Sequence, residues 1–180
     1  MLFINNIKQF LAEKSINKVL SSQERETHFP NYKSIKSILI LFKSEENEKN
    51  PFIRKIISEL KEEGKKVTVW GYVDKKEVET PILPDFRLFG NSEINFYDIP
   101  KSLMVNEFTH MQYDMVIQMT ISDVIPLDYL MAKAHSPFKV SRIKPYKGIA
   151  DFMIKINESE DDLFLYNQIM HYLKSIQAKN

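Results

Sequence analysis

The sequence predicts an α/β protein: a three-layer, Rossmann-like open sheet of five to six mostly parallel strands, preceded by an N-terminal amphipathic helix. Two observations predict this fold. Short apolar runs alternate with longer segments whose apolar residues recur every three or four positions, as in strands alternating with helices. The first of these runs is apolar throughout, which is typical of a strand covered on both faces. The length of 180 residues suits one such domain with a short extension.

Residues 2–20 form the predicted N-terminal helix. Its apolar positions recur at helical spacing, with a shift of phase after the first four: Phe3, Ile7, Phe10, Leu11, Ile16, Val19 and Leu20. A polar segment containing Pro30 follows. We therefore divide the chain into a helix and linker over residues 1–31 and a single α/β domain over residues 32–180. The helix is expected to pack on the domain, with homodimerisation as the alternative and a membrane surface not expected.

A strand–helix–strand unit comes next. Residues 37–42 are predicted as a buried strand, and Asn50 and Pro51 start the following helix as cap and first helical residue. Gly64 ends that helix, because glycine adopts the left-handed conformation without steric cost. The second strand, 66–72, is then parallel to the first, with a right-handed connection.

The second half of the chain continues the alternation. Either 86–89 or 94–97 supplies a short strand between the prolines of residues 81–100. Further strands are predicted at 113–120, 138–141 and 152–156, and further helices at 101–111 and about 126–134. The last helix is expected to begin near Ser159, whose spacing to Asp162 matches a capping box.

Composition excludes several chemistries. The chain has no Cys, so disulfides, zinc–thiolate sites and cysteine nucleophiles are excluded. Its four glycines are dispersed, so neither common phosphate-binding glycine motif is present, and three carboxylates follow the first strand at 45–48. The four histidines have no metal-ligand spacing. We predict no metal, no cofactor and no catalytic constellation.

A polar cluster follows the strand at 113–120. Thr120, Ser122 and Asp123 lie where that strand ends and a helix is about to begin. Ligands of open α/β sheets bind at the carboxyl ends of the strands, so these side chains are candidates for ligand binding. The simpler interpretation is helix capping, which Ser and Asp favour.

A basic segment follows the next strand. Residues 133–147 carry six basic or histidine side chains and no acid. Arg142 and Lys144 leave the carboxyl end of the strand at 138–141, beside Thr120 and Asp123 if the two strands are neighbours. There they could hold a phosphate or carboxylate. The alternative interpretation is a solvated basic loop that balances the acidic residues 157–162.

Several strand segments, together with Glu63 to Tyr72, resemble an uncharacterised family of short Bacteroidetes proteins. They include 36–42, 113–117, 138–140 and 151–154. The resemblance covers residues 33–176 and implies a Rossmann-like domain of unknown function, with no assigned reaction.

A weaker likeness is to the N-terminal half of heptosyltransferase-type glycosyltransferases. It is carried by the strand at 114–117 and by a later strand that ends in Arg142. Ser44, Glu45 and Glu46 replace the Gly-Asp turn of those enzymes, and 180 residues leave no room for their donor-binding half. The likeness therefore implies a half-domain without catalysis.

The sequence alone leaves the function open. Our leading hypothesis is a non-catalytic, cytoplasmic protein that binds a partner or small anionic ligand at the carboxyl ends of its strands. The alternatives are a transferase-like enzyme that uses Asp123 and Arg142, and a dimerising interaction protein. The formal charge of +1 and the single short basic segment argue against nucleic acid. The longest apolar run, 38–42, is too short to cross a membrane, and no signal peptide is expected.

Overall fold

A computed structural model describes residues 2–44, 51–78, 85–157 and 159–176. Six strands form one sheet in the order β3-β2-β1-β4-β5-β6, and every neighbouring pair is parallel. The strands are β1 (Ser37–Ser44), β2 (Lys66–Val73), β3 (Phe86–Phe89), β4 (Met115–Met119), β5 (Lys139–Arg142) and β6 (Phe152–Ile154). The order runs outward in both directions from the central pair β1 and β4, which is the doubly wound arrangement. The predicted open α/β sheet is confirmed.

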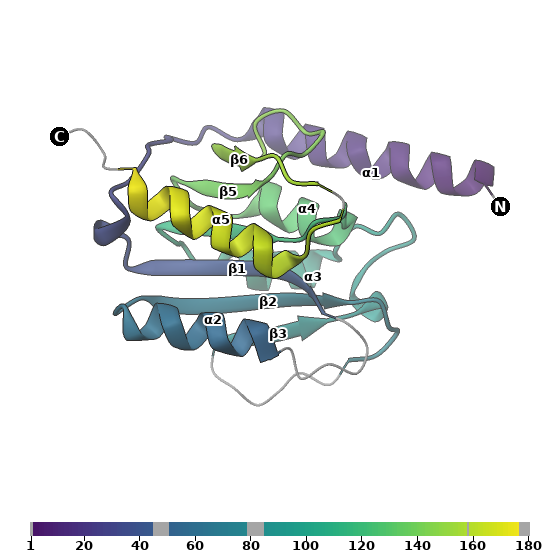
Figure 1. The fold of residues 1–180 in the computed structure, drawn as a ribbon. Helices are drawn as coiled ribbons and strands as arrows, with labels where there is room; N and C mark the ends of the chain where they lie inside the picture. The colour runs from purple at the N-terminus through teal and green to yellow at the C-terminus, as the bar shows by residue number, and fades with distance from the viewer. Residues whose placement is uncertain (1, 45–50, 79–84, 158, 177–180) are drawn as a thin grey trace.

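Helices cover both faces of the sheet (Figure 1). On one face lie α2 (Pro51–Glu62) and α5 (Asp162–Ser175); on the other lie α1 (Leu2–Ser22), α3 (Ser102–Thr109) and α4 (Ile125–Lys133). Alternate residues of β1 enter the two cores: Ile38 and Ile40 face α2 and α5, whereas Leu39 and Leu41 face the other layer. This two-sided burial explains why β1 is apolar throughout.

Helix α1 packs through its C-terminal half. Ala12, Ile16 and Val19 are buried, a spacing that places them on one helix face, and α1 contacts α4. Ile7 and Phe10 are 44% and 64% exposed. Figure 1 shows the N-terminal half of α1 extending past the sheet. The helix is thus packed at Ala12, Ile16 and Val19 and exposed at Ile7 and Phe10.

The segment 23–31 runs along the amino ends of β5 and β6. Arg25 forms a bidentate ion pair with Asp151, at 2.7 and 2.6 Å. Phe29 packs edge-on against Phe138, with ring centroids 4.8 Å apart. The polar segment is therefore attached to the sheet by an ion pair and by an aromatic contact.

The structure decides one choice that the sequence left open and corrects the predicted start of the last helix. Of the two candidate strands before α3, 86–89 pairs with β2, whereas Ile94 forms an isolated antiparallel bridge with Pro100. Helix α5 is capped by Asp161, which accepts a hydrogen bond from Phe164 N, and not by Ser159. The reason is a turn in which Glu160 N donates to Asn157 O, so that the helix starts later than the spacing suggested. The predicted cap Asn50 and the acidic residues 45–48 lie outside the described residues.

Two glycines have clear structural roles. Gly64 has a φ of +77° and ends α2, as predicted. Gly71 lies within β2, where a Cβ atom would come within 2.5 Å of the Phe42 ring and 2.6 Å of Leu88. A side chain at this position would push β2 away from its neighbours. Within the described residues, no helix combines the length and apolarity needed to cross a membrane.

Candidate functional site

Three adjoining pockets lie at the carboxyl ends of the strands, where the strand order reverses. The central pocket, of about 530 Å³, lies between Lys43, Thr120 and the start of α5. The acidic pocket, of about 480 Å³, contains Asp74, Asp98 and Asp123. The basic pocket, of about 520 Å³, is lined by Ile121, Ser122, Asp123, Arg142, Ile143, Lys155, Ile156 and Asn157. Asp123 lines both the acidic and the basic pocket, so it forms the wall between them.

Arg142 and Asp123 are in direct contact. Strands β4 and β5 are neighbours, so the loop after β4 and the end of β5 meet at one edge. Arg142 Nη2 donates to Asp123 Oδ1 at 2.5 Å, and Nη1 donates to the carbonyl of Ile143. The Asp123 side chain is 53% exposed, whereas that of Arg142 is 17% exposed. The Nε atom of Arg142 is buried and has no hydrogen-bond partner among the described residues.

Lys144 lies behind this ion pair with its side chain fully buried. Its Nζ is 2.8 Å from Asp128 Oδ1, which is also fully buried, and 3.4 Å from Asp123 Oδ1. It also donates to the carbonyl of Ser122 at 3.4 Å. Lys144 therefore joins the exposed loop to a buried carboxylate in α4.

Gln118 and Asp128 extend the network into the core. Gln118 Nε2 donates to Asp128 Oδ1 at 2.6 Å and to Thr120 Oγ1 at 3.4 Å. Burial raises the pKa of Asp128, although Lys144 and Gln118 oppose that rise. Gln118 Oε1 and Asp128 Oδ2 are buried without a hydrogen-bond partner in the described part of the chain. The interior of the site therefore holds two acceptor atoms that the described part of the chain leaves unpaired.

The interpretation of Thr120, Ser122 and Asp123 as helix caps was wrong. The N-cap of α4 is Val124, whose side chain has no polar atom. Asp123 instead faces Arg142 and Lys144, because the end of β5 lies beside its loop, and it forms charge-assisted hydrogen bonds with both. Thr120 is buried and contacts Gln118, while Ser122 is exposed and contributes its carbonyl.

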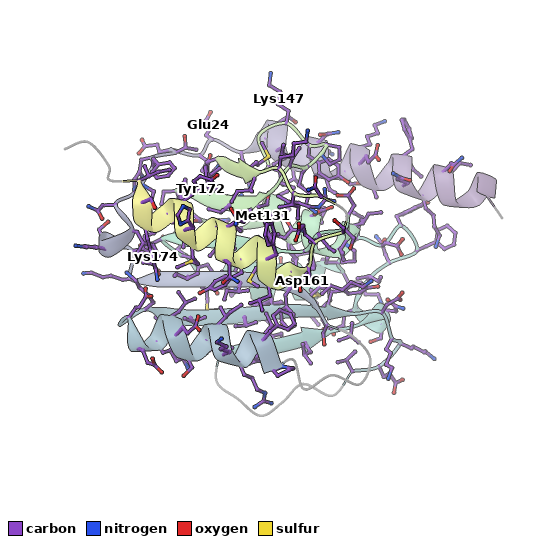
Figure 2. All side chains as sticks on the ribbon, viewed as in Figure 1. Glu24, Met131, Lys147, Asp161, Tyr172 and Lys174 are labelled. Atoms are coloured by element: carbon purple, nitrogen blue, oxygen red, sulfur yellow. The ribbon has the colours of Figure 1, made fainter. Side chains whose placement is uncertain are left out.

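The interpretation of residues 133–147 as a solvated basic loop was also wrong for Lys139, Arg142 and Lys144. Lys139 is 1% exposed, and its Nζ donates to the carbonyls of Met131 and Ala132 at the end of α4. Lys144 is buried, and Arg142 is largely so. Lys147 does fit a solvated basic residue, because it is exposed and points away from the body of the molecule (Figure 2).

The sequence profile of a family of unknown function, DUF6913, matches residues 8–176. The match covers α1 from residue 8 onward, the whole sheet and α5, and thus every residue of the three pockets. The chain belongs to this family. No curated protein and no solved structure matches the chain. The expected membership in a family of unknown function is confirmed, whereas the Bacteroidetes source and the glycosyltransferase likeness stay predictions.

In this DUF6913 protein, sequence reasoning missed Gln118 and Asp128. Each had a signal. Gln118 is polar within the apolar run of β4, and Asp128 lies among apolar residues of α4. A polar side chain placed on the buried face of such an element needs a buried partner. The two were missed because their partnership depends on how α4 sits on β4.

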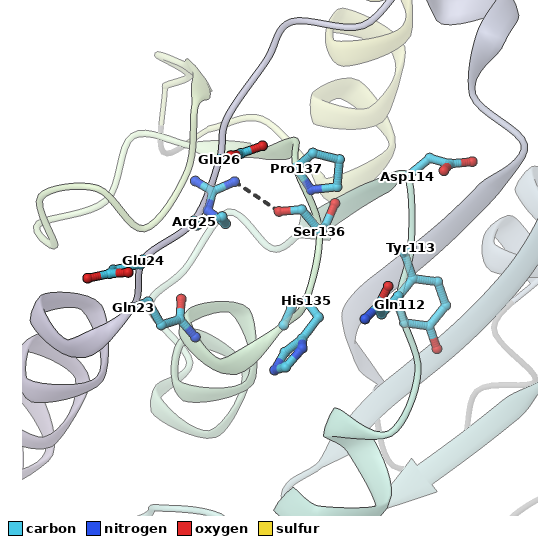
Figure 3. Close-up of a pocket in the computed structure, with 11 residues that line it drawn as sticks. Gln23, Glu24, Arg25, Glu26, Gln112, Tyr113, Asp114, His135, Ser136 and Pro137 are labelled. Atoms are coloured by element: carbon cyan, nitrogen blue, oxygen red, sulfur yellow. Dashed lines mark hydrogen bonds between the residues drawn. The ribbon is translucent and has the colours of Figure 1, made fainter.

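A further pocket, of about 500 Å³, lies at the opposite edge of the sheet. Figure 3 shows it between the segment that follows α1 and the amino ends of β4 and β5, with Arg25 donating to the Ser136 carbonyl. Arg25 also holds Asp151, and Asp114 accepts from the backbone N–H groups of Lys36 and Ser37. Throughout the described ranges, no three His, Asp or Glu side chains converge as a metal site would require.

Proposed function

We propose that this protein binds a small anionic ligand, bearing a phosphate or carboxylate group, in the basic pocket, and that it acts as a binding protein rather than an enzyme. The guanidinium of Arg142 carries this proposal. Its Nε and Nη2 atoms share the edge that recognises two oxygens of an anion at once. At present Nη2 holds one oxygen of Asp123, while Nε is buried with no partner in the described residues.

The energetics favour exchange of Asp123 for a ligand anion. A buried donor without a partner costs about 1–3 kcal/mol, which a second oxygen on the same edge would recover. Asp123 is 53% exposed, so its carboxylate would return to water at little cost. Lys144 behind the pair and Lys155 in the pocket wall would retain a positive environment for the incoming anion.

The ion pairs also support binding over transferase-like catalysis. The transferase-like alternative needs Asp123 to exchange a proton with a substrate. Oδ1 of Asp123 is already held by both Arg142 Nη2 and Lys144 Nζ, so this oxygen does not face a substrate. Release of a product from phosphorylated or sugar-nucleotide substrates, abolished by Arg142→Ala, would contradict the binding role.

Calorimetric titration with inorganic phosphate tests the proposal. We expect saturable binding that Arg142→Gln weakens by about tenfold or more, because a hydrogen bond to a charged group contributes about 1.5–3 kcal/mol. Asp123→Asn should strengthen binding several-fold, since it removes the competing charge. Lys147→Gln is the matched control and should change the affinity less than twofold. Equal affinity of the Arg142→Gln variant and the unmodified protein would refute the site.

Self-association through α1 is a second candidate role, supported by the exposure of Ile7 and Phe10 on the half of the helix that extends past the sheet. A second copy of this chain could cover both side chains with its own α1. Light scattering at high protein concentration should then show a dimer that Phe10→Glu dissociates. A monomer at every concentration would remove this role.

A further inference from the structure

We call the side of the sheet formed by the carboxyl ends of the strands the carboxyl edge, and the opposite side the amino edge. The acidic pocket is the part of the carboxyl edge that the proposed anion site leaves unused. It lies across Asp123 from Arg142, at the ends of β1 and β2. Its polar lining consists of Lys43, Tyr72, Asp74, Asn91, Asn95 and Asp98, together with Asp123. Asp123 separates the two pockets, so a ligand that displaces its carboxylate from Arg142 could occupy both.

A hydrogen-bonded network orients Asp74, the residue that directly follows β2. Tyr72, which is 8% exposed, donates its hydroxyl to Asn91 Oδ1 at 2.6 Å. Asn91 Nδ2 in turn donates to Asp74 Oδ1 at 2.9 Å. One oxygen of the carboxylate is thereby fixed in direction. A fixed carboxylate is better suited to recognising a ligand than a freely rotating one, because less side-chain entropy is lost on binding.

The charges of the two pockets differ in sign. Arg142 and Lys155 line the basic pocket, whereas Asp74 and Asp98 line the acidic pocket with Lys43 as its cation. A phosphate would be repelled by the acidic pocket. The acidic pocket combines acceptors (the carboxylates) with donors (Lys43 and the amides of Asn91 and Asn95). Hydroxyl groups both donate and accept hydrogen bonds and match this lining, whereas an ammonium group can only donate.

We infer that the ligand is a phosphorylated polyol or sugar, with its phosphate on Arg142 in the basic pocket and its hydroxyls on Asp74 and its neighbours in the acidic pocket. The inference rests on the proposed anion-binding function and adds the chemical class of the ligand. It makes Asp74 a specificity-determining residue, because Asp74 would select for hydroxyls without contacting the phosphate.

Calorimetric titrations with ribose 5-phosphate, ribose and inorganic phosphate test the inference. We expect ribose 5-phosphate to bind at least about tenfold more tightly than inorganic phosphate, a gain equivalent to about 1.4 kcal/mol. Asp74→Ala should abolish this gain and leave the affinity for inorganic phosphate unchanged. Arg142→Gln should weaken binding of both phosphates. Glu59→Gln, on the exposed face of α2, is the control and should alter neither.

The outcomes separate the two proposals. If ribose 5-phosphate and inorganic phosphate bind equally well and both depend on Arg142, the anion site stands and the polyol inference fails. The inference also fails if the tenfold gain persists in the Asp74→Ala variant. If no phosphate binding depends on Arg142, the proposed function itself is wrong. Asp74 is exposed, so the Asp74→Ala variant should fold like the unmodified protein, which a thermal melt checks.

Discussion

The two edges of the sheet both carry clustered charges, but they differ in how completely those charges are matched. At the amino edge, Arg25 pairs through two hydrogen bonds with Asp151, and Lys139 donates to two carbonyls at the end of α4. Asp114 accepts from two backbone N–H groups, and these bonds lower its pKa although burial alone would raise it. These groups fasten the segment 23–31 and the strands to one another.

The carboxyl edge is different. Within the described residues, the buried side-chain atoms without a hydrogen-bond partner are Gln118 Oε1, Asp128 Oδ2 and Arg142 Nε, and all belong to this edge. Buried polar groups are normally paired, so a local concentration of unpaired ones points to a missing partner. Pocket size does not favour the carboxyl edge, because pockets at the amino edge are about 500 and 700 Å³, whereas the basic pocket is about 520 Å³. The two edges differ in how completely their buried polar atoms are hydrogen-bonded.

The largest expected effect tests whether the buried charges of the carboxyl edge depend on one another. Asp128→Asn leaves Lys144 buried without its fully buried counter-ion. Removal of one partner of a buried pair costs about 3–5 kcal/mol in the free energy of unfolding, which urea denaturation would measure.

Adding Lys144→Met to the Asp128→Asn variant should recover most of that loss, because both charges are then gone. A loss below about 1 kcal/mol for Asp128→Asn would show that the buried charges of the carboxyl edge do not depend on one another.

The amino edge should respond less strongly in stability and not at all in binding. Arg25→Met breaks an ion pair whose side chains are 16% and 21% exposed, so we expect a loss of about 2 kcal/mol, between the values for surface and buried pairs. The affinity for inorganic phosphate should stay within twofold of that of the unmodified protein. A large change in affinity would mean that the two edges are coupled.

Lys139 offers a pH test of the amino edge. Burial, with a further contribution from Arg25, lowers the pKa of Lys139 to about 7. In the unfolded chain the pKa is about 10.4, so between these values the unfolded state holds a proton that the folded state lacks. Stability should therefore rise with pH across this window, by up to about 1.4 kcal/mol per pH unit.

Urea denaturation of the Lys139→Met variant between about pH 7 and pH 9 should show that this rise is lost. Lys147→Met, an exposed control, should keep it. The same rise in the Lys139→Met variant would assign the effect to another group.

The sheet and part of the candidate site could be predicted from the sequence. Strands β1, β2 and β4 could be located from the sequence, because a short continuous apolar run is typical of a strand covered on both faces. Thr120, Asp123, Arg142 and Lys144 could be grouped because parallel neighbours end at one edge. That step needed only strand direction and adjacency.

Other features required the three-dimensional packing. A basic residue such as Lys139 looks the same in sequence whether it is solvated or lies under a helix end. Its burial follows from the position of α4 over β5, which places two carbonyls within reach of its Nζ. The pairing of Gln118 with Asp128 depends on that same helix position. Side-chain pairing across elements is a property of packing, which periodicity does not encode.

The loop that carries Asp123 is also attached to the opposite layer of helices. Ile121 N donates to Asp162 Oδ1 in the first turn of α5, at 2.9 Å, next to the cap residue Asp161 (Figure 2). The loop thus connects the Asp123–Arg142 ion pair with helix α5. Because this hydrogen bond holds the loop backbone at Ile121, Asp123 can leave Arg142 by rotation of its side chain, while the loop and α5 stay in place.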